Sequence, residues 1–274
     1  MKLSRALSIL NHMRHAFSIG LMPTLRAVLA SPGLLLRPQE LSRVYMAELW
    51  AIMGDGPDDT KAKLITPHAY GVVLDLGAGH GNILPYLDKT RVTRYIALEP
   101  NTFMHASIRA EAHKIGFNES NGSLVILGCG AEDTNTILQY LKEISGHAGN
   151  PVQIDTVVSI RTLCTVPNAP KAMENLICDA VKPGGQFLMY EHVRNKRQDV
   201  AWWQHFWTPL WSVVFDGCKL DRDTDVWVKD LQKQVAIDGT MKRASVWRDI
   251  EMWGVEGDEE DSMLWHSVGR FVKA

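Results

Sequence analysis

The sequence predicts an α/β fold in which a mostly parallel sheet carries helices on both faces. From about residue 71 onward, short apolar runs alternate with amphipathic segments, which is typical of βαβ units. A glycine-rich loop follows the first apolar run, and the last two runs have no helix between them. We therefore expect parallel strands through most of the sheet and an antiparallel hairpin at its end.

The composition limits the classes of function. Hydrophobic residues make up 46% of the 274 residues and charged residues 22%, which indicates a globular protein rather than a coiled coil or a disordered chain. Basic and acidic residues nearly balance, 29 against 31, so no basic field exists to attract nucleic acid. The cysteines form no CxxC pair, which favours reduced thiols in a cytoplasmic protein over disulfides or a metal site: Cys129, Cys164, Cys178 and Cys218.

Residues 1–70 predict an N-terminal helical extension. Through residue 39 the chain carries five basic residues and no acidic one, while apolar residues recur at near-helical spacing: Leu3, Leu7, Leu10 and Phe17. Pro23, Arg26 and Pro32 break the longer apolar stretch that a membrane span would need, and polar residues interrupt any signal-peptide core. Two interpretations stay open: a lid over the body of the protein, or a helix that lies on a membrane surface.

The remaining elements are expected in the following order. A helix over 41–53 ends at the breaker-rich Gly54-Asp55-Gly56-Pro57. Five strands with helical connections come next, at 72–76, 95–98, 124–127, 156–160 and 187–190. After an aromatic helical insertion at about 200–218, a hairpin pairs 244–252 with 264–272 across an acidic, solvated loop.

The first strand leads into the loop Gly77-Ala78-Gly79-His80-Gly81. Glycines permit a sharp turn and let backbone N–H groups approach a ligand at the start of a helix, which we expect to begin near Asn82. The spacing GxGxG differs from the GxGxxG of dinucleotide-binding enzymes, which disfavours hydride transfer. The second strand ends in Glu99, where a carboxylate can accept both ribose hydroxyls of an adenosine-containing ligand.

From Gly71 to Ala274 the chain resembles the class I S-adenosylmethionine-dependent methyltransferases. The resemblance rests on the glycine loop, Glu99, the turn Lys182-Pro183-Gly184-Gly185 and the final hairpin. It implies a Rossmann-like, mostly parallel seven-stranded sheet with an antiparallel last strand, and S-adenosyl-L-methionine as the cofactor. The family commonly has an Asp where this chain has Gly130, in the adenine loop. The implied cofactor-binding residues are Asp75, Gly77, Ala78, Gly79, Gly81, Asn82, Glu99, Pro100, Ala131, Glu132, Ser159 and Ile160.

A narrower resemblance is to the methyltransferase-like thiol S-methyltransferases, which are membrane-associated enzymes with a basic N-terminal segment. It rests on Glu191-His192-Val193, the aromatic stretch 202–211 and Phe215-Asp216-Gly217-Cys218. It implies a small lipophilic acceptor, with a thiol favoured over a hydroxyl or an amine. The chain departs from that group in lacking an uninterrupted apolar anchor and in a loop over 146–153 that looks expanded.

Large rings recur on one helical face of the insertion, and they supply the candidates for binding the acceptor: Trp203, Trp207 and Trp211. The alternative is that these rings are ordinary core. An insertion at this point would pack over the carboxyl ends of the strands, where open α/β sheets bind their ligands. Such a surface suits a flat or apolar acceptor.

Two polar residues are the catalytic candidates. His192, directly after the fifth strand, is placed to act as a general base, and its alternative is a histidine bonded to nearby backbone. Arg161 follows the fourth strand and either binds an anionic group of the acceptor or pairs with a nearby acid. Cys164 and Cys218 have no histidine and acid partners recognisable in the sequence, so we expect buried thiols and no metal site.

The expected protein is therefore an extension over 1–70 and a methyltransferase domain over 71–274. Its function would be the methylation of a small molecule, as in secondary metabolism, with peripheral membrane contact as an open alternative. A protein of the same fold that holds the cofactor and catalyses a rearrangement or cyclisation is the second hypothesis. The sequence leaves open whether S, O, N or C is methylated, and it leaves open the oligomeric state.

Overall fold

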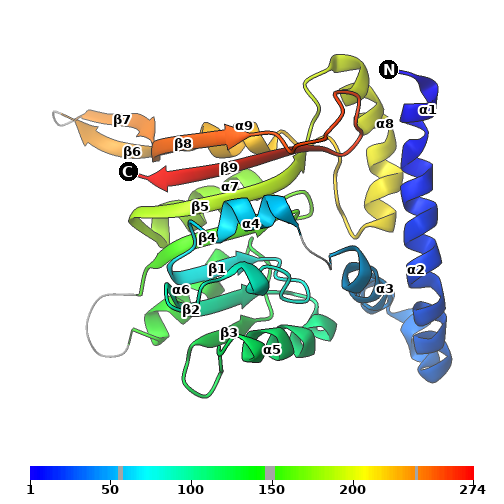
Figure 1. Ribbon diagram of the computed structural model, residues 1–274, viewed down its shortest axis with the longest axis horizontal. Coiled ribbons are helices and arrows are strands. Elements are labelled where there is room, and N and C mark those ends of the chain that lie inside the picture. Colours follow the sequence, from blue (N-terminus) through cyan, green and yellow to red (C-terminus); the bar gives the residue numbers. More distant parts are fainter. Residues whose placement is uncertain (55–57, 146–151, 238–239) are drawn as a thin grey trace.

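A seven-stranded sheet of order β3-β2-β1-β4-β5-β9-β8 forms the centre of the computed structural model (Figure 1), which describes residues 1–54, 58–145, 152–237 and 240–274. The first five strands pair in parallel, whereas β9 is antiparallel to both β5 and β8. This confirms the Rossmann-like sheet with an antiparallel last strand. The strands are β1 (Gly71–Leu76), β2 (Val92–Leu98), β3 (Leu124–Leu127), β4 (Ile154–Ile160), β5 (Val181–Val193), β8 (Trp247–Trp253) and β9 (Trp265–Lys273).

Helices cover both faces of the sheet because successive strand side chains point to opposite sides. In β1, Leu74 and Leu76 belong to the apolar cluster with α6 (Thr134–Glu143), α7 (Ala169–Asp179) and α9 (Thr224–Lys229). Val73 belongs to the cluster on the other face, with α4 (Asp59–Ile65) and α5 (His105–Lys114). The two clusters fix the strand register, since a shift by one residue would exchange the faces.

The N-terminal helices and α8 (Gln198–Val214) form a third layer beside the sheet, with α2 and α8 side by side in Figure 1. The layer contains α1 (Leu3–Ala6), α2 (Ser8–Ala30), η1 (Pro32–Leu36) and α3 (Pro38–Met53). Ile9, Met13 and Ala16 of α2 are buried in one apolar cluster with residues of α3 and α8. One face of α2 is therefore buried against the rest of the protein.

The expectation that Pro23 interrupts the N-terminal segment is wrong, because Pro23 lies inside the continuous helix α2. Proline removes one backbone hydrogen bond, and the packing of α2 against α3 compensates for that loss. Among the described helices, none is both long enough and apolar enough to cross a membrane.

The expectation that a helix begins near Asn82 is also wrong. The chain forms turns there, followed only by the 3₁₀ turn η2 (Leu84–Tyr86). Pro85 removes a backbone donor, and Asp88 then accepts the N–H of Thr90 in a local turn, so no longer helix develops before β2. A second 3₁₀ turn, η3 (Thr102–Met104), precedes α5.

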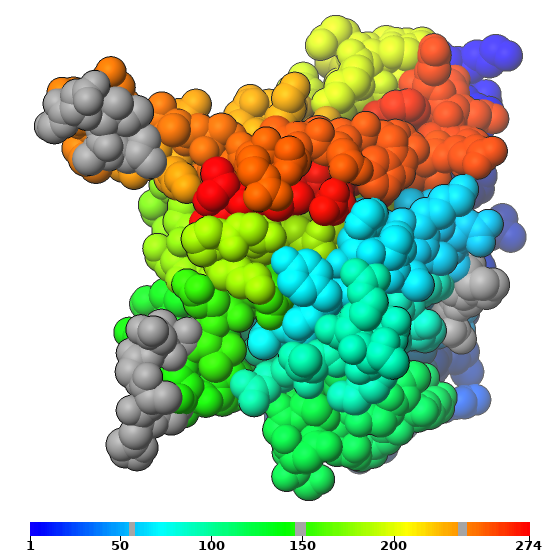
Figure 2. Space-filling view, turned by 60° about the vertical axis from the view of Figure 1, so that its left-hand side comes forward, coloured from blue at the N-terminus to red at the C-terminus, as the bar shows by residue number. Residues whose placement is uncertain are grey.

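The sequence missed a second, two-stranded sheet of β6 (Gln232–Ile237) and β7 (Thr240–Ser245), which stands out from the body of the molecule in Figure 2. The strand expected at 244–252 begins three residues later, at Trp247, because Ser245 ends β7. Residues 55–57 of the expected breaker and 146–151 of the expected expanded loop lie outside the described residues.

Candidate functional site

A cavity of about 540 Å³ lies over the carboxyl ends of β1, β2, β4 and β5, with walls from the N-terminal helices and the end of α8. This position is where open α/β sheets bind ligands, and the volume lies within the range of about 300 to 1,000 Å³ for ligand pockets. Most of the predicted cofactor residues line it: Asp75, Gly77, Ala78, Gly79, Asn82, Glu99, Pro100, Ala131, Glu132 and Ile160.

Some of the predicted site residues stand elsewhere. Gly81 and Ser159 are not among the residues that line the cavity, and the Ser159 hydroxyl donates to Glu191 at 2.7 Å. Trp211 lines the cavity, whereas Trp203 and Trp207 pack half-buried against the cluster around the N-terminal helices. The aromatic face of α8 is therefore divided between the cavity and the core.

The glycine loop uses the backbone freedom of glycine. Gly77, Gly79 and Gly81 have φ of +63°, +58° and +84°, in the left-handed region that other residues rarely adopt. A Cβ on Gly79 would meet only the side-chain amide of Asn82, at 3.6 Å, so the loop leaves open space at this glycine. No α-helix follows the loop, and two of its N–H groups bond within the protein, that of Ala78 to the carbonyl of Leu98 at 2.9 Å and that of Gly81 to the carbonyl of Ala78 at 2.8 Å. The loop therefore offers a ligand the open space at Gly79 and no helix dipole.

Two buried carboxyl groups stand beside this loop. Glu99 accepts the backbone N–H groups of Gly79 at 2.7 Å and Asn101 at 2.8 Å, and burial raises the pKa of Glu99 to about 6. Asp75 accepts the hydroxyl of Tyr95 at 2.6 Å, and burial raises the pKa of Asp75 to about 7. Each Glu99 oxygen keeps a second lone pair, so the carboxylate can also accept the hydroxyls of a ribose.

Glu132 occupies the space that the missing side chain at Gly130 leaves free. A Cβ on Gly130 would collide with the Glu132 carboxylate, and both residues line the cavity. A carboxylate therefore stands beside the position where the family commonly has an Asp, although it comes from two residues further along the chain.

Helix α3 is fastened over the glycine loop by hydrogen bonds. His80 of the loop bonds through Nε2 to the carbonyl of Ala47 at 2.8 Å, and Asn101 donates its side-chain N–H to the carbonyl of Arg43 at 2.7 Å. The N-terminal segment thus forms part of the cavity wall.

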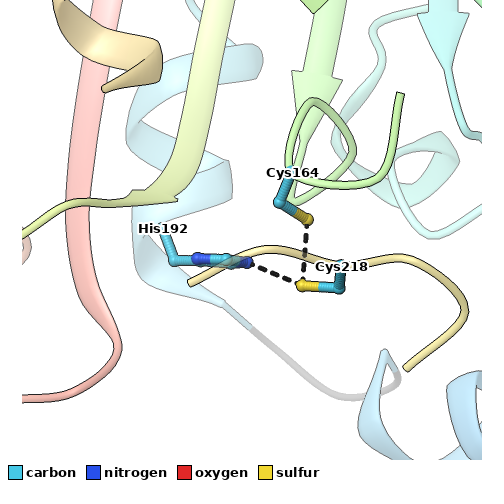
Figure 3. Close-up of side chains that lie close together, drawn as sticks. All are labelled: Cys164, His192 and Cys218. Carbon is cyan, nitrogen blue, oxygen red and sulfur yellow. Dashed lines mark hydrogen bonds between the residues drawn. The ribbon is translucent and has the colours of Figure 1, made fainter. Parts of the chain in front are cut away.

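One half of the cavity, here called the acceptor half, has apolar walls from three segments: Met46 and Trp50 of α3, Trp211 and Phe215 at the end of α8, and Leu264 before β9. His192, Cys164 and Cys218 meet there (Figure 3). Nε2 of His192 lies 3.1 Å from Sγ of Cys218, and the two sulfur atoms lie 3.3 Å apart. The cysteines are buried as expected, but the sequence did not reveal the histidine beside them, and His192 bonds to sulfur instead of backbone.

The contacts within this cluster shift the pKa values of its side chains. The hydrogen bond with Cys164, together with His192 and the indole N–H of Trp211, lowers the pKa of Cys218 well below its ordinary value. Burial lowers the pKa of His192, but the neighbouring Cys218 and Glu191 outweigh this effect and leave that pKa raised.

Arg161 brings a positive charge to the same half. Its backbone is left-handed, with φ of +55°, its guanidinium donates to the hydroxyl of Tyr190 at 2.7 Å, and it stacks over that ring. Within the described part of the chain, no carboxylate forms an ion pair with Arg161. The guanidinium therefore keeps its charge available to a ligand in the cavity.

Part of the chain is similar in sequence to two known proteins. The chain is 35% identical over 75 residues to the thiol S-methyltransferase TMT1A of Homo sapiens, which is 26% of this chain and 29% of that protein. It is 34% identical over 105 residues to the thiol S-methyltransferase TMT1B of Rattus norvegicus, 36% of this chain and 41% of that protein. Both alignments span less than half of the relatives' lengths.

A solved O-methyltransferase family protein from Burkholderia thailandensis has the same fold. It matches with a TM-score of 0.52 and 14% identity, over 87% of this chain and 60% of that chain. The fold is that of the class I S-adenosylmethionine-dependent methyltransferases, and the cavity lies where sheets of this kind bind their ligands. The chain belongs to the methyltransferase domain family, which matches residues 12–222. The predicted family is thereby confirmed.

Proposed function

We propose that the protein transfers the methyl group of S-adenosylmethionine to the thiol of a small lipophilic acceptor. The observation that carries this proposal is the acceptor half of the cavity, where apolar side chains and the guanidinium of Arg161 line the same space. A thiolate is apolar in its body and anionic at its reacting atom, so it suits this surface better than a cationic amine. The partial likeness to thiol S-methyltransferases supports the same acceptor.

The cofactor supplies an electrophilic methyl group on a sulfonium, and the chain supplies binding and orientation. The Gly79 loop and Glu99 hold the cofactor, while Trp211 and Phe215 exclude water on the acceptor side. Transfer is an in-line displacement, so the chain must hold the acceptor sulfur about 3 Å from the methyl carbon. Arg161 stabilises the thiolate before it reacts, and the positive charge of the cofactor disappears as the new S–C bond forms.

The test compares an alkyl thiol with the alcohol, amine and carboxylate of the same chain length. We expect S-adenosylhomocysteine to accumulate with the thiol, in equal amount to the methyl thioether, and at least about tenfold more slowly with the others because their reacting groups are less nucleophilic or carry the wrong charge. Turnover of the amine or the alcohol without any turnover of thiols would overturn the proposal. Product without release of S-adenosylhomocysteine would favour a rearrangement or cyclisation instead.

We also propose that the N-terminal layer rests on an anionic membrane. The side of α2 that faces away from the protein remains apolar, and α8 adds a second exposed apolar stripe beside it. The exposed residues are Leu3, Leu7, Leu10, Phe17, Leu21 and Leu25 on the first stripe, and Trp202, Phe206 and Leu210 on the second. Exposed Arg14 and Arg26 on α2 add positive charge, which attracts anionic headgroups. The lid and the membrane helix are then two faces of one segment.

Sedimentation with vesicles tests this contact. The triple variant Phe17→Glu, Leu21→Glu, Leu25→Glu should lose most binding to phosphatidylserine-containing vesicles, because charge replaces the inserted face. A control with Val226→Glu, Met241→Glu and Ile250→Glu changes equally exposed apolar residues on other elements and should bind like the unaltered protein. Equal vesicle binding by both triple variants, or none by the unaltered protein, would overturn the membrane proposal.

A further inference from the structure

Two thiols and an imidazole converge at the acceptor half of the cavity, from three separate parts of the fold. Cys164 follows β4, His192 belongs to β5, and Cys218 follows α8. Figure 3 shows the side chains of Cys164 and His192 directed toward Cys218. The two sulfurs and one imidazole nitrogen all lie within 4.8 Å of one another, and all three residues line the cavity.

Hydrogen bonds to the backbone hold these three segments in place independently of the sulfur atoms. Oε1 of Glu191 accepts the N–H groups of Thr162 at 2.9 Å and Leu163 at 3.1 Å, which fixes the Cys164 loop against β5. The N–H of Lys219 donates to the carbonyl of Cys164 at 3.1 Å, which fixes the Cys218 segment to the same loop. The cluster is therefore preorganised, as a ligand site requires.

The donor set matches one class of ligand. Two cysteine sulfurs and one histidine nitrogen are the protein ligands of catalytic zinc sites that keep a fourth position open. Tetrahedral coordination with Zn–S bonds of about 2.3 Å separates two sulfurs by about 3.8 Å, so the present 3.3 Å needs only a small outward shift. The indole N–H of Trp211 already donates to Cys218 at 3.2 Å, and such outer contacts orient metal-bound thiolates.

We propose that Cys164, His192 and Cys218 bind a zinc-class divalent cation whose fourth position faces the cavity and holds the acceptor thiol as a thiolate. This rests on the proposed function, since it assigns a role to the acceptor sulfur. The cysteines release their protons to solvent when the cation binds, and the acceptor releases its proton when its sulfur replaces water. The sulfur lone pair then forms the new S–C bond, the sulfonium S–C bond breaks, and S-adenosylhomocysteine leaves with that electron pair.

Sequence spacing conceals such a site. Zinc ligands often come in short pairs such as CxxC, whereas these three residues belong to widely separated segments. Only the closure of β4, β5 and the end of α8 around the cavity brings them together. The expectation of no metal site came from the missing pairs.

The experiment titrates full-length, reduced protein with cobalt(II) chloride without oxygen, and then with zinc chloride. We expect a single cobalt ion per chain, with thiolate-to-cobalt charge-transfer absorption and the visible bands of four-coordinate cobalt, which zinc abolishes. Cys164→Ser and Cys218→Ser should each weaken binding more than about 100-fold, beyond the 10- to 100-fold cost of an outer-shell change. Cys178→Ser, at a half-buried cysteine away from the cavity, should bind cobalt unchanged.

Two further measurements make every outcome decisive. Thermal stabilisation by S-adenosylhomocysteine shows that each variant is folded, so loss of cobalt binding in a folded variant supports the site. An alkyl thiol added to the cobalt protein should change the visible bands, and the alcohol of the same chain length should not. The inference would be overturned if the unaltered protein bound S-adenosylhomocysteine but no cobalt. It would also be overturned if the visible absorption bands of the cobalt protein did not change when the thiol is added.

The failure of this inference differs from the failure of the proposed function. Metal-free protein that methylates thiols at full rate overturns the metal site and leaves the thiol acceptor standing. Stoichiometric cobalt binding in a protein that methylates only non-thiol acceptors overturns the proposed function and the role assigned to the fourth position. A disulfide between Cys164 and Cys218 in the freshly purified, active protein would also overturn the site, because oxidised sulfurs do not ligate the cation.

Discussion

The two halves of the cavity are built in different ways. The cofactor half consists of short local motifs at the ends of neighbouring strands, namely the glycine loop after β1 and Glu99 after β2. The acceptor half is assembled from α3, the loop after β4, the end of β5 and the segment after α8. Backbone geometry makes the first half, whereas side chains from distant segments make the second. The cofactor half can therefore be altered by changing one glycine. The acceptor half can be altered by changing how helices pack at a distance from the cavity.

The largest effect is expected from Gly79→Val, which acts on the cofactor half alone. The present φ of +58° disfavours a branched residue, and the side chain would project into the open space beside the loop. We expect no thermal stabilisation by S-adenosylhomocysteine, whereas the unaltered protein gains about 2.7 kcal/mol at 100 times its dissociation constant. Differential scanning calorimetry with and without the ligand measures the difference.

Gly116→Val is the matched control for the glycine loop. Gly116 also has a left-handed backbone, with φ of +87°, and nothing lies within 4 Å of its Cβ position, but it does not line the cavity. This variant should lose stability without losing the shift caused by S-adenosylhomocysteine. If Gly116→Val lost that shift as well, backbone strain in general, and not the glycine loop, would explain the result.

A smaller effect on the same half comes from Glu99→Gln. In the unaltered folded protein the pKa of Glu99, about 6, lies above its ordinary value of 4.5. The Glu99 carboxylate therefore destabilises the ligand-free protein above pH 6, and this destabilisation disappears below about pH 4.5. The expected contact with the ribose hydroxyls needs the ionised carboxylate, so affinity for S-adenosylhomocysteine should fall up to about tenfold per pH unit below 6. The variant should bind about 10- to 100-fold more weakly at pH 8 and lose the dependence below pH 6.

Titration calorimetry across pH 5 to 8 measures this dependence. Asp75, with its pKa of about 7, is present in both proteins, and the charge of Glu99 is one of the causes that raise this pKa. Any dependence that comes from Asp75 should therefore persist in the variant and move to lower pH. An equally steep fall below pH 6 in Glu99→Gln would assign the titration to another group and would remove the ribose contact from the account of the cofactor half.

The same contrast explains what the sequence could predict. The strands of the sheet, the glycine loop and Glu99 are encoded by residues that are neighbours in the chain. The sequence could therefore predict where the strands lie and that the loop and Glu99 line the cavity. The pairing of His192 with Cys218 depends on the tertiary closure of β5 against the end of α8, and no spacing encodes it. The helix expected after Gly81 was inferred from the glycine loop, and it does not form because Pro85 and the turn at Asp88 favour a 3₁₀ turn.

The smallest effect tests whether the two halves respond separately to packing. Gly20 of α2 lies so close to Tyr45 of α3 that an added Cβ would collide with the ring, so Gly20→Leu must push the two helices apart. Overpacking of this kind costs about 1 to 3 kcal/mol of stability. Because α3 carries Met46 and Trp50 into the acceptor half, we expect a few-fold rise in KM for the thiol.

Gly33→Leu, at an exposed glycine with only the end of Arg37 nearby, is the control. The affinity for S-adenosylhomocysteine should change less than about twofold in both variants, because Glu99 and the glycine loop are held by the sheet. A parallel loss of thiol turnover and cofactor affinity in Gly20→Leu would show instead that α3, through its bonds to His80 and Asn101, couples the halves into one unit.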